Sequence, residues 1–162
     1  MGEATGLAEE LQRRLKGNVL LVCAGNTLRG DDGAGPAVGA LLEGKIRAAL
    51  MDVGEAPENY VGRIVDAAPD TIVFIDAADF GARPGDVAIL ETDDIAGCGI
   101  STHQMPLKLF FRYLRENSRA EVFAIGIQPA QIGFGESMDA GVASSVQALA
   151  LLLQDLMPLS GA

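Results

Sequence analysis

Several carboxylates and one histidine of this chain stand at the ends of apolar segments, where such side chains can do chemistry. Asp31 and Asp32 follow one apolar run, Asp76 follows another, and His103, the only histidine, precedes a segment with helical spacing. Two further carboxylates at comparable positions are Asp52 and Asp79. Carboxylate oxygens combined with one imidazole nitrogen suit a divalent transition metal that keeps open coordination positions. The residue types therefore suggest a metal site.

Each of these residues also has a structural interpretation. Asp31 or Asp32 could cap the helix that follows them, and Asp76 could close a turn after its strand. Asp79 could simply face solvent, and a single histidine before a helix is more often structural than a ligand. Because the residues are far apart in sequence, only the fold can bring them together. The residues alone leave both interpretations open.

The apolar segments predict an alternation of strands and helices. The run over 19–24 is apolar at every position, which is typical of a strand buried on both faces of a parallel sheet. Further strands are expected over 48–53, 71–75, 86–91 and 122–127. Helices are expected over 5–16 with Thr5 as its N-cap, from Pro36 onward, and over 57–67, 104–116 and 137–156, with a loop over 92–100.

This alternation predicts an α/β protein with an open, mostly parallel sheet. The segment 86–91 follows the preceding strand too closely for a crossover helix, so we expect it to be an antiparallel edge strand. In an open α/β sheet, ligands bind at the carboxyl ends of the strands. The fold would therefore bring Asp31, Asp32, Asp52, Asp76 and Asp79 to one rim.

Charge and cysteine content exclude several classes of protein. Twelve Lys and Arg against 22 Asp and Glu give a net charge of −10, which argues against binding to nucleic acid or an acidic membrane. Cys23 and Cys98 are too few for a disulfide scaffold and fit a reduced, cytoplasmic setting. The N-terminus lacks the apolar core of a secretory signal, and the tract over 140–154 is too short and too polar to span a bilayer.

The glycine-rich segment 25–33 permits a nucleotide-binding alternative, because a turn between a strand and a helix can cradle phosphate. The segment contains neither G-x-G-x-x-G nor a Gly-Lys-Ser/Thr sequence, and Asp31 and Asp32 would repel a pyrophosphate. Catalysis by a cysteine and a histidine is another alternative, because Cys98 lies only a few residues before His103. It is the weaker one, because a reduced thiol without a catalytic role explains Cys98 equally well.

Five motifs occur in order along the chain: G-N-T-L-R-G-D-D-G-A-G-P at 25–36, D-V-G-E-A-P-E-N at 52–59, I-D-A-A-D-F-G at 75–81, S-T-H-Q-M-P-L at 101–107 and G-I-Q-P at 126–129. With these motifs the chain resembles the [NiFe]-hydrogenase maturation endopeptidases of the hydrogenase 3, or formate-hydrogenlyase, type. The resemblance implies a single-domain three-layer sandwich, in which a twisted five-stranded sheet has helices on both faces. It implies a protease domain over 18–158, preceded by a helical extension over 1–17.

The resemblance also implies a function. Members of the family remove a C-terminal extension from the large-subunit precursor of a [NiFe]-hydrogenase after nickel insertion. Asp32, Asp76 and His103 fall at the family's metal-contacting positions and are the expected catalytic and metal-binding residues. The nickel would come with the precursor, which leaves open that the free enzyme holds none. Residues expected to support these ligands or to touch the peptide are Asp31, Asp52, Asp79 and Gln128.

We therefore expect a nickel-dependent endopeptidase that acts in the cytoplasm, as a monomer, on a hydrogenase large-subunit precursor. Nucleic acid and membranes are not expected as partners. Two alternatives are kept: a checkpoint protein of the same fold that binds the nickel-loaded precursor without cutting it, and a nucleotide-binding α/β domain.

Overall fold

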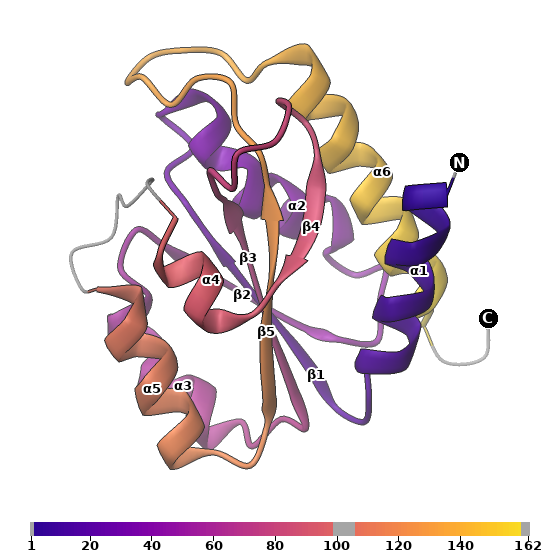
Figure 1. The fold of residues 1–162 in the computed structure, drawn as a ribbon. Helices are drawn as coiled ribbons and strands as arrows, with labels where there is room; N and C mark the ends of the chain where they lie inside the picture. The colour runs from indigo at the N-terminus through magenta and orange to yellow at the C-terminus, as the bar shows by residue number, and fades with distance from the viewer. Residues whose placement is uncertain (1, 99–105, 160–162) are drawn as a thin grey trace.

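The computed structural model describes residues 2–98 and 106–159, which form a five-stranded sheet between two layers of helices (Figure 1). The strands are β1 (Val19–Ala24), β2 (Ala49–Gly54), β3 (Thr71–Ala77), β4 (Val87–Leu90) and β5 (Glu121–Ile127). Their order across the sheet is β2-β1-β3-β5-β4. The pairs β1–β2, β1–β3 and β3–β5 are parallel, and β4 runs antiparallel to β5. The predicted α/β sandwich with one antiparallel edge strand is confirmed.

Helices cover both faces of the sheet. The helical segments are α1 (Gly2–Arg14), η1 (Gly30–Gly33), α2 (Ala34–Leu42), η2 (Pro57–Tyr60), α3 (Val61–Asp66), α4 (Thr92–Ala96), α5 (Leu107–Asn117) and α6 (Ala140–Leu156), where η marks a 3-10 helix. One face is covered by α1, α2 and α6, and the other by α3, α4 and α5. None of these helices, within the two described ranges, is long and apolar enough to cross a membrane.

The central strands are buried on both faces, which explains their unbroken apolar sequence. Every residue of β1 and β3 is buried. Successive side chains of a strand point to opposite faces, so Leu21 joins the core under α2 and α6, while Val22 joins the core under α5. In that second core the Phe74 ring lies 5.7 Å from the Phe110 ring and 5.2 Å from the Phe111 ring. These contacts fix α5 against the sheet.

The helices differ from the sequence prediction at several places: α1 ends at Arg14 rather than 16, α2 begins at Ala34 rather than Pro36, and three further differences have a clear local cause. The first helix begins at Gly2, so Thr5 lies inside α1 and the prediction that it is the N-cap is wrong. The segment predicted as a loop from residue 92 begins with α4, whose first turn carries Asp93 and Asp94 and which buries Ile95. Acidic residues favour the N-terminus of a helix, but a five-residue helix is too short to show an apolar period. The last helix begins at Ala140 rather than 137, because the side chain of Asp139 caps it.

The first helix is fixed to the far edge of the sheet by one arginine. Arg14 binds Glu91 beside β4 at 2.7 Å and Glu121 at the start of β5 at 2.8 Å. Its guanidinium also lies 4.2 Å from the centre of the Phe123 ring. The helical extension is thus part of the folded core.

The order β2-β1-β3 creates a switch point between β1 and β3. From β1 the chain crosses one face through α2 to β2, and from β2 it returns across the other face through α3 to β3. The carboxyl ends of β1 and β3 are therefore neighbours from which the following loops diverge, which is where doubly wound sheets bind ligands. Helix α2 lies close to this point: a Cβ on Gly35 would lie 2.3 Å from the Ala24 carbonyl oxygen and 2.4 Å from that of Ile75. Only glycine fits there.

Candidate functional site

Two buried carboxylates lie at the switch point. Asp32 belongs to η1, in the connection that follows β1, and only 1% of the residue is exposed. Asp76 is near the end of β3 and is 3% exposed. Segment η1 contacts β3 directly, so the two residues reach the same end of two adjacent parallel strands. Oδ2 of Asp32 accepts a hydrogen bond from the Asn26 amide at 2.9 Å, which fixes this carboxylate relative to the glycine-rich loop.

The third residue of the expected metal site, His103, lies outside the described residues. Within 2–98 and 106–159, no three His, Cys, Asp or Glu side chains are grouped closely enough to hold a metal ion. The structure thus brings Asp32 and Asp76 to one end of the sheet, and the complete set with His103 stays a prediction.

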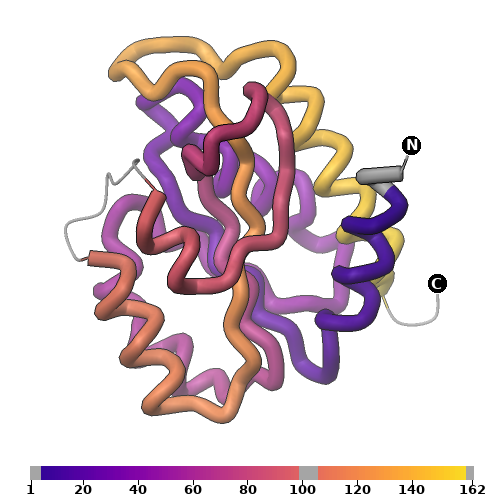
Figure 2. Tube along the Cα trace, viewed as in Figure 1, coloured from indigo at the N-terminus to yellow at the C-terminus, as the bar shows by residue number. Residues whose placement is uncertain are grey.

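Asp31 has a different environment from its neighbour Asp32. It is fully buried, and its Oδ2 accepts hydrogen bonds from the Ala130 amide at 2.7 Å and the Gln131 amide at 2.9 Å. Its Oδ1 accepts from the Asp139 amide at 2.7 Å. Charge-assisted bonds of this kind are stronger than neutral ones. Asp31 therefore holds the β5–α6 loop, residues 128–139, against the loop that follows β1. Figure 2 shows the two loops next to each other at one end of the molecule.

Gln128 holds the loop that follows Asp76. Its side chain is buried, and its Oε1 accepts hydrogen bonds from the amides of Phe80 at 2.9 Å and Ala82 at 3.1 Å. Its Nε2 donates to Oδ1 of Asp79 at 3.1 Å. The sequence suggested only that Gln128 supports the ligands or touches the peptide, and it could not name the partners of this side chain because they lie on another loop. The structure shows that it fixes the β3–β4 connection at the site.

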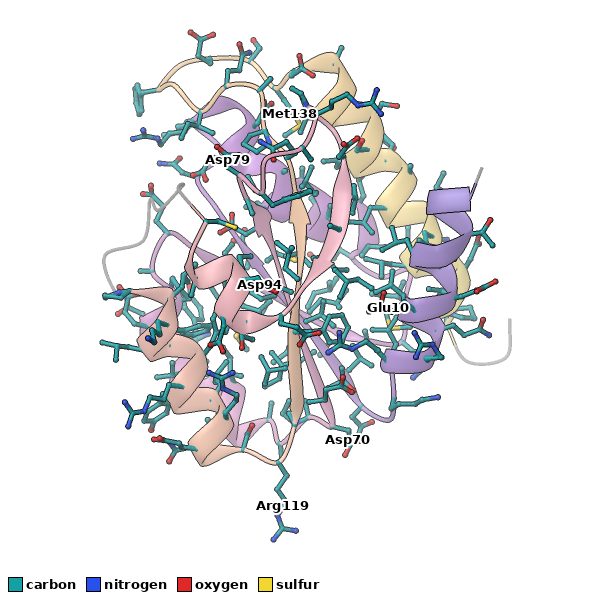
Figure 3. The ribbon with its side chains drawn as sticks, in the orientation of Figure 1. Glu10, Asp70, Asp79, Asp94, Arg119 and Met138 are labelled. Atoms are coloured by element: carbon teal, nitrogen blue, oxygen red, sulfur yellow. The ribbon has the colours of Figure 1, made fainter. Side chains whose placement is uncertain are left out.

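The remaining two carboxylates are exposed. Asp79 lies on the β3–β4 loop, and Figure 3 shows it at the carboxyl end of the sheet, while Asp70 and Arg119 mark the opposite end. Asp52 lies within the edge strand β2, beside Cys23 of β1, and its Oδ1 accepts from the Gly54 amide at 3.0 Å. Asp79 is thus beside the switch point, and Asp52 is separated from β3 by β1.

The environments of both cysteines raise the pKa of the thiol. Burial, with a smaller effect of the Asp52 charge, raises the pKa of Cys23 to about 12. Burial also raises the pKa of Cys98, and the charges of Asp79, Asp94 and Asp76 raise it further. Because the thiolate is the reactive form, these environments disfavour a cysteine nucleophile. They also place Cys98 in the field of the carboxylates at the switch point, a proximity that the sequence did not reveal.

Several amides of the glycine-rich loop are already used in hydrogen bonds within the protein. The Leu28 amide donates to Oδ1 of Asn26 at 2.8 Å, and the Asp31 amide donates to the Gln131 carbonyl at 2.9 Å. The Arg29 amide binds the Asn26 carbonyl at 3.1 Å. A phosphate cradle needs such amides to point at the ligand. The internal bonds and the buried acids disfavour the nucleotide-binding alternative. A surface hollow of about 500 Å³ lies elsewhere, between Asp70 and Arg119 at the opposite end of the sheet.

The fold and site together define a doubly wound α/β protein with buried carboxylates at its switch point. A sequence model of the hydrogenase maturation protease family (HycI) matches residues 39–155, which include Asp76 and His103 but begin after Asp32. The hydrogenase 3 maturation protease of Escherichia coli (strain K12) is 38% identical over 135 residues, covering 79% of this chain and 83% of the relative.

Solved structures of hydrogenase maturation proteases are similar to this chain in both fold and sequence. The [NiFe] hydrogenase maturation protease HycI from Thermococcus kodakarensis KOD1 has a TM-score of 0.82 at 30% identity, covering 91% of this chain and 97% of that one. A hydrogenase 3 maturation protease has a TM-score of 0.77 at 34% identity, covering 89% and 94%. The chain belongs to the hydrogenase maturation protease family, and the activity of this family is that of a hydrolase.

Proposed function

We propose that this protein is an endopeptidase that removes the C-terminal extension of a [NiFe]-hydrogenase large-subunit precursor after nickel insertion. The observation that carries the proposal is the burial of Asp32 and Asp76 at the neighbouring ends of β1 and β3, in a chain of this protease family. Asp32, Asp76 and His103 bind the nickel, which belongs to the substrate.

Burial makes these carboxylates suited to an incoming cation. A buried carboxylate loses the stabilisation of water, and a divalent ion bound to it restores part of that energy. The chain has a single histidine, whereas resident zinc sites usually combine several His or Cys ligands. This composition supports a site that is completed by a metal arriving with its own ligands on the precursor.

Nickel recognition would let the enzyme distinguish loaded from empty precursor. A coupling of about 3 kcal/mol between nickel and precursor binding corresponds to more than a hundredfold difference in affinity. Nickel at the carboxylates can lower the pKa of a bound water or polarise the scissile carbonyl. Hydrolysis then adds the water oxygen to the acyl carbon and leaves the extension with a free amine.

A processing assay tests this function. The protein, as a single chain, is incubated with nickel-loaded and nickel-free precursor, and loss of the extension is followed by intact mass. Cleavage of only the loaded precursor is the expected result. Cleavage of both forms at equal rates would refute nickel recognition and retain the protease.

The second candidate is a checkpoint that binds the loaded precursor without cutting it. The same pair of buried carboxylates favours it, because nickel binding requires no cleavage. Nickel-dependent complex formation with the precursor mass unchanged would support this candidate over the endopeptidase.

A further inference from the structure

Two large apolar side chains are held in solvent at the edge of the site. Leu28, in the loop after β1, is 61% exposed, and Phe134, in the β5–α6 loop, is 75% exposed. Both loops lie at the same end of the sheet as the carboxylates (Figures 1 and 2). Exposing this much apolar surface costs free energy in water, so a pair kept at one place suggests a binding role.

The backbone brings the two residues together. The amide of Gly135, next to Phe134, donates to the Leu28 carbonyl at 2.8 Å. Nε of Arg29 donates to the Ile132 carbonyl at 3.3 Å. With the three bonds to the Asp31 carboxylate, these contacts join the two loops into one rigid unit. A preorganised surface loses little conformational entropy when a ligand binds.

The same unit is continuous with the candidate site. Oδ1 of Asn26 accepts from the Leu28 amide at 2.8 Å, and the Asn26 amide donates to Oδ2 of Asp32 at 2.9 Å. Asn26 thus connects the backbone at Leu28 to the buried carboxylate of Asp32. A chain that reaches Asp32 across this rim passes beside Leu28.

We propose that Leu28 and Phe134 form an apolar platform that binds an apolar segment of the precursor next to the scissile bond. This inference rests on the proposed function and specifies how the peptide is held there. Exposed carboxylates nearby, on Asp79 and Glu136, disfavour an acidic segment at this place. Apolar contact is made in the ground state and in the transition state alike, so the platform affects KM more than kcat.

Kinetics with nickel-loaded precursor tests the platform. Leu28→Ala and Phe134→Ala, and the double variant, are compared with Leu151→Ala, which removes a leucine that is 63% exposed on α6. The double variant should raise KM on the order of tenfold and leave kcat within about twofold, and Leu151→Ala should change neither. Melting temperatures should stay unchanged because all three side chains are exposed.

Several outcomes would overturn the platform. An unchanged KM in the double variant, or an equal rise in KM for Leu151→Ala, would refute the platform. The proposed protease function would still stand. If the wild type binds the precursor without cleaving it, the Kd of the precursor for each variant replaces KM as the test of the platform. An unchanged Kd in the double variant would then remove the platform. If the wild type neither binds nor cleaves precursor, the proposed function and the platform fail together. A self-association lost on Leu28→Ala, seen by sedimentation, would assign the surface to a second copy instead.

Discussion

Nε2 of Gln128 donates a hydrogen bond to Oδ1 of Asp79 at 3.1 Å, across the gap between the end of β5 and the loop after β3. The side-chain oxygen of Gln128, Oε1, accepts hydrogen bonds from the amides of Phe80 and Ala82. A buried amide that donates to a carboxylate and accepts from two amides has no isosteric substitute among the other side chains. One side chain thus makes three hydrogen bonds to the loop that carries Asp79 beside the site.

Replacing Gln128 by Glu should loosen this loop. The change keeps oxygens for Phe80 and Ala82 but sets a carboxylate against Asp79, which costs about 1–3 kcal/mol of unfolding free energy. Urea unfolding measures that loss, and hydrogen exchange at the two amides should become faster. The control, Gln147→Glu, adds the same charge on the exposed face of α6. Equal stability of the two variants would contradict the role of Gln128.

Asp31→Asn should destabilise the protein because it sets an amide group among three donors. The Asp31 carboxylate accepts from the amides of Ala130, Gln131 and Asp139, and Asn can satisfy them only in part. A loss of about 2–4 kcal/mol is expected, which lowers the melting temperature by roughly 5–15 °C in a domain of this size. Circular dichroism measures the shift against Asp66→Asn, an exposed change at the end of α3. A matched shift in both variants would refute the prediction.

Asp32→Asn and Asp76→Asn should each slow processing of nickel-loaded precursor by on the order of a hundredfold or more. Asn keeps the size of the side chain but removes the negative charge, so it is a weaker ligand for a divalent ion. Initial rates by intact mass give the comparison, with Asp155→Asn on the exposed side of α6 as the control. A wild-type rate in either variant would exclude that residue from nickel recognition.

Alkylation should reveal the electrostatic environment of Cys98. Its raised pKa, caused first by burial and then by Asp79, Asp94 and Asp76, leaves less thiolate at pH 8 than an exposed cysteine has. Its reaction with iodoacetamide should therefore be slower than normal at pH 8 and keep accelerating as the pH rises further. Asp94→Asn removes one raising charge and should speed the reaction. Cys23, with a pKa of about 12, should stay unmodified, as mass spectrometry of the digested protein would show.

The buried strands could be predicted from sequence because burial on both faces leaves a direct signature. Val19–Ala24 is apolar throughout, and its partner β3 is nearly so. The antiparallel direction of β4 could be predicted from the length of the connection between β3 and β4, which is too short for a crossover helix. Helix α4 was missed since five residues carry no period, and the N-cap at Thr5 was wrong because α1 begins earlier.

The site was predictable only in part. The pattern of strands and loops placed Asp31, Asp32 and Asp76 after strands, but only the family resemblance distinguished Asp32 from Asp31, which has the same side chain one position earlier. The difference depends on three amides that lie about a hundred residues further along the chain. The partners of Gln128 are likewise on a distant loop. Long-range hydrogen bonds of this kind leave no local pattern.

The Arg14 anchor has a practical consequence for handling this protein. Because Arg14 fixes α1 to the β4–β5 edge, the beginning of α1 lies on the same flank of the molecule as α6, apart from the rim that carries the carboxylates (Figure 1). An affinity tag or a surface linker joined to the N-terminus would therefore emerge beside α6, to one side of the proposed site. Immobilisation through that terminus should hold the protein by this flank in one orientation and leave the proposed site open to a precursor.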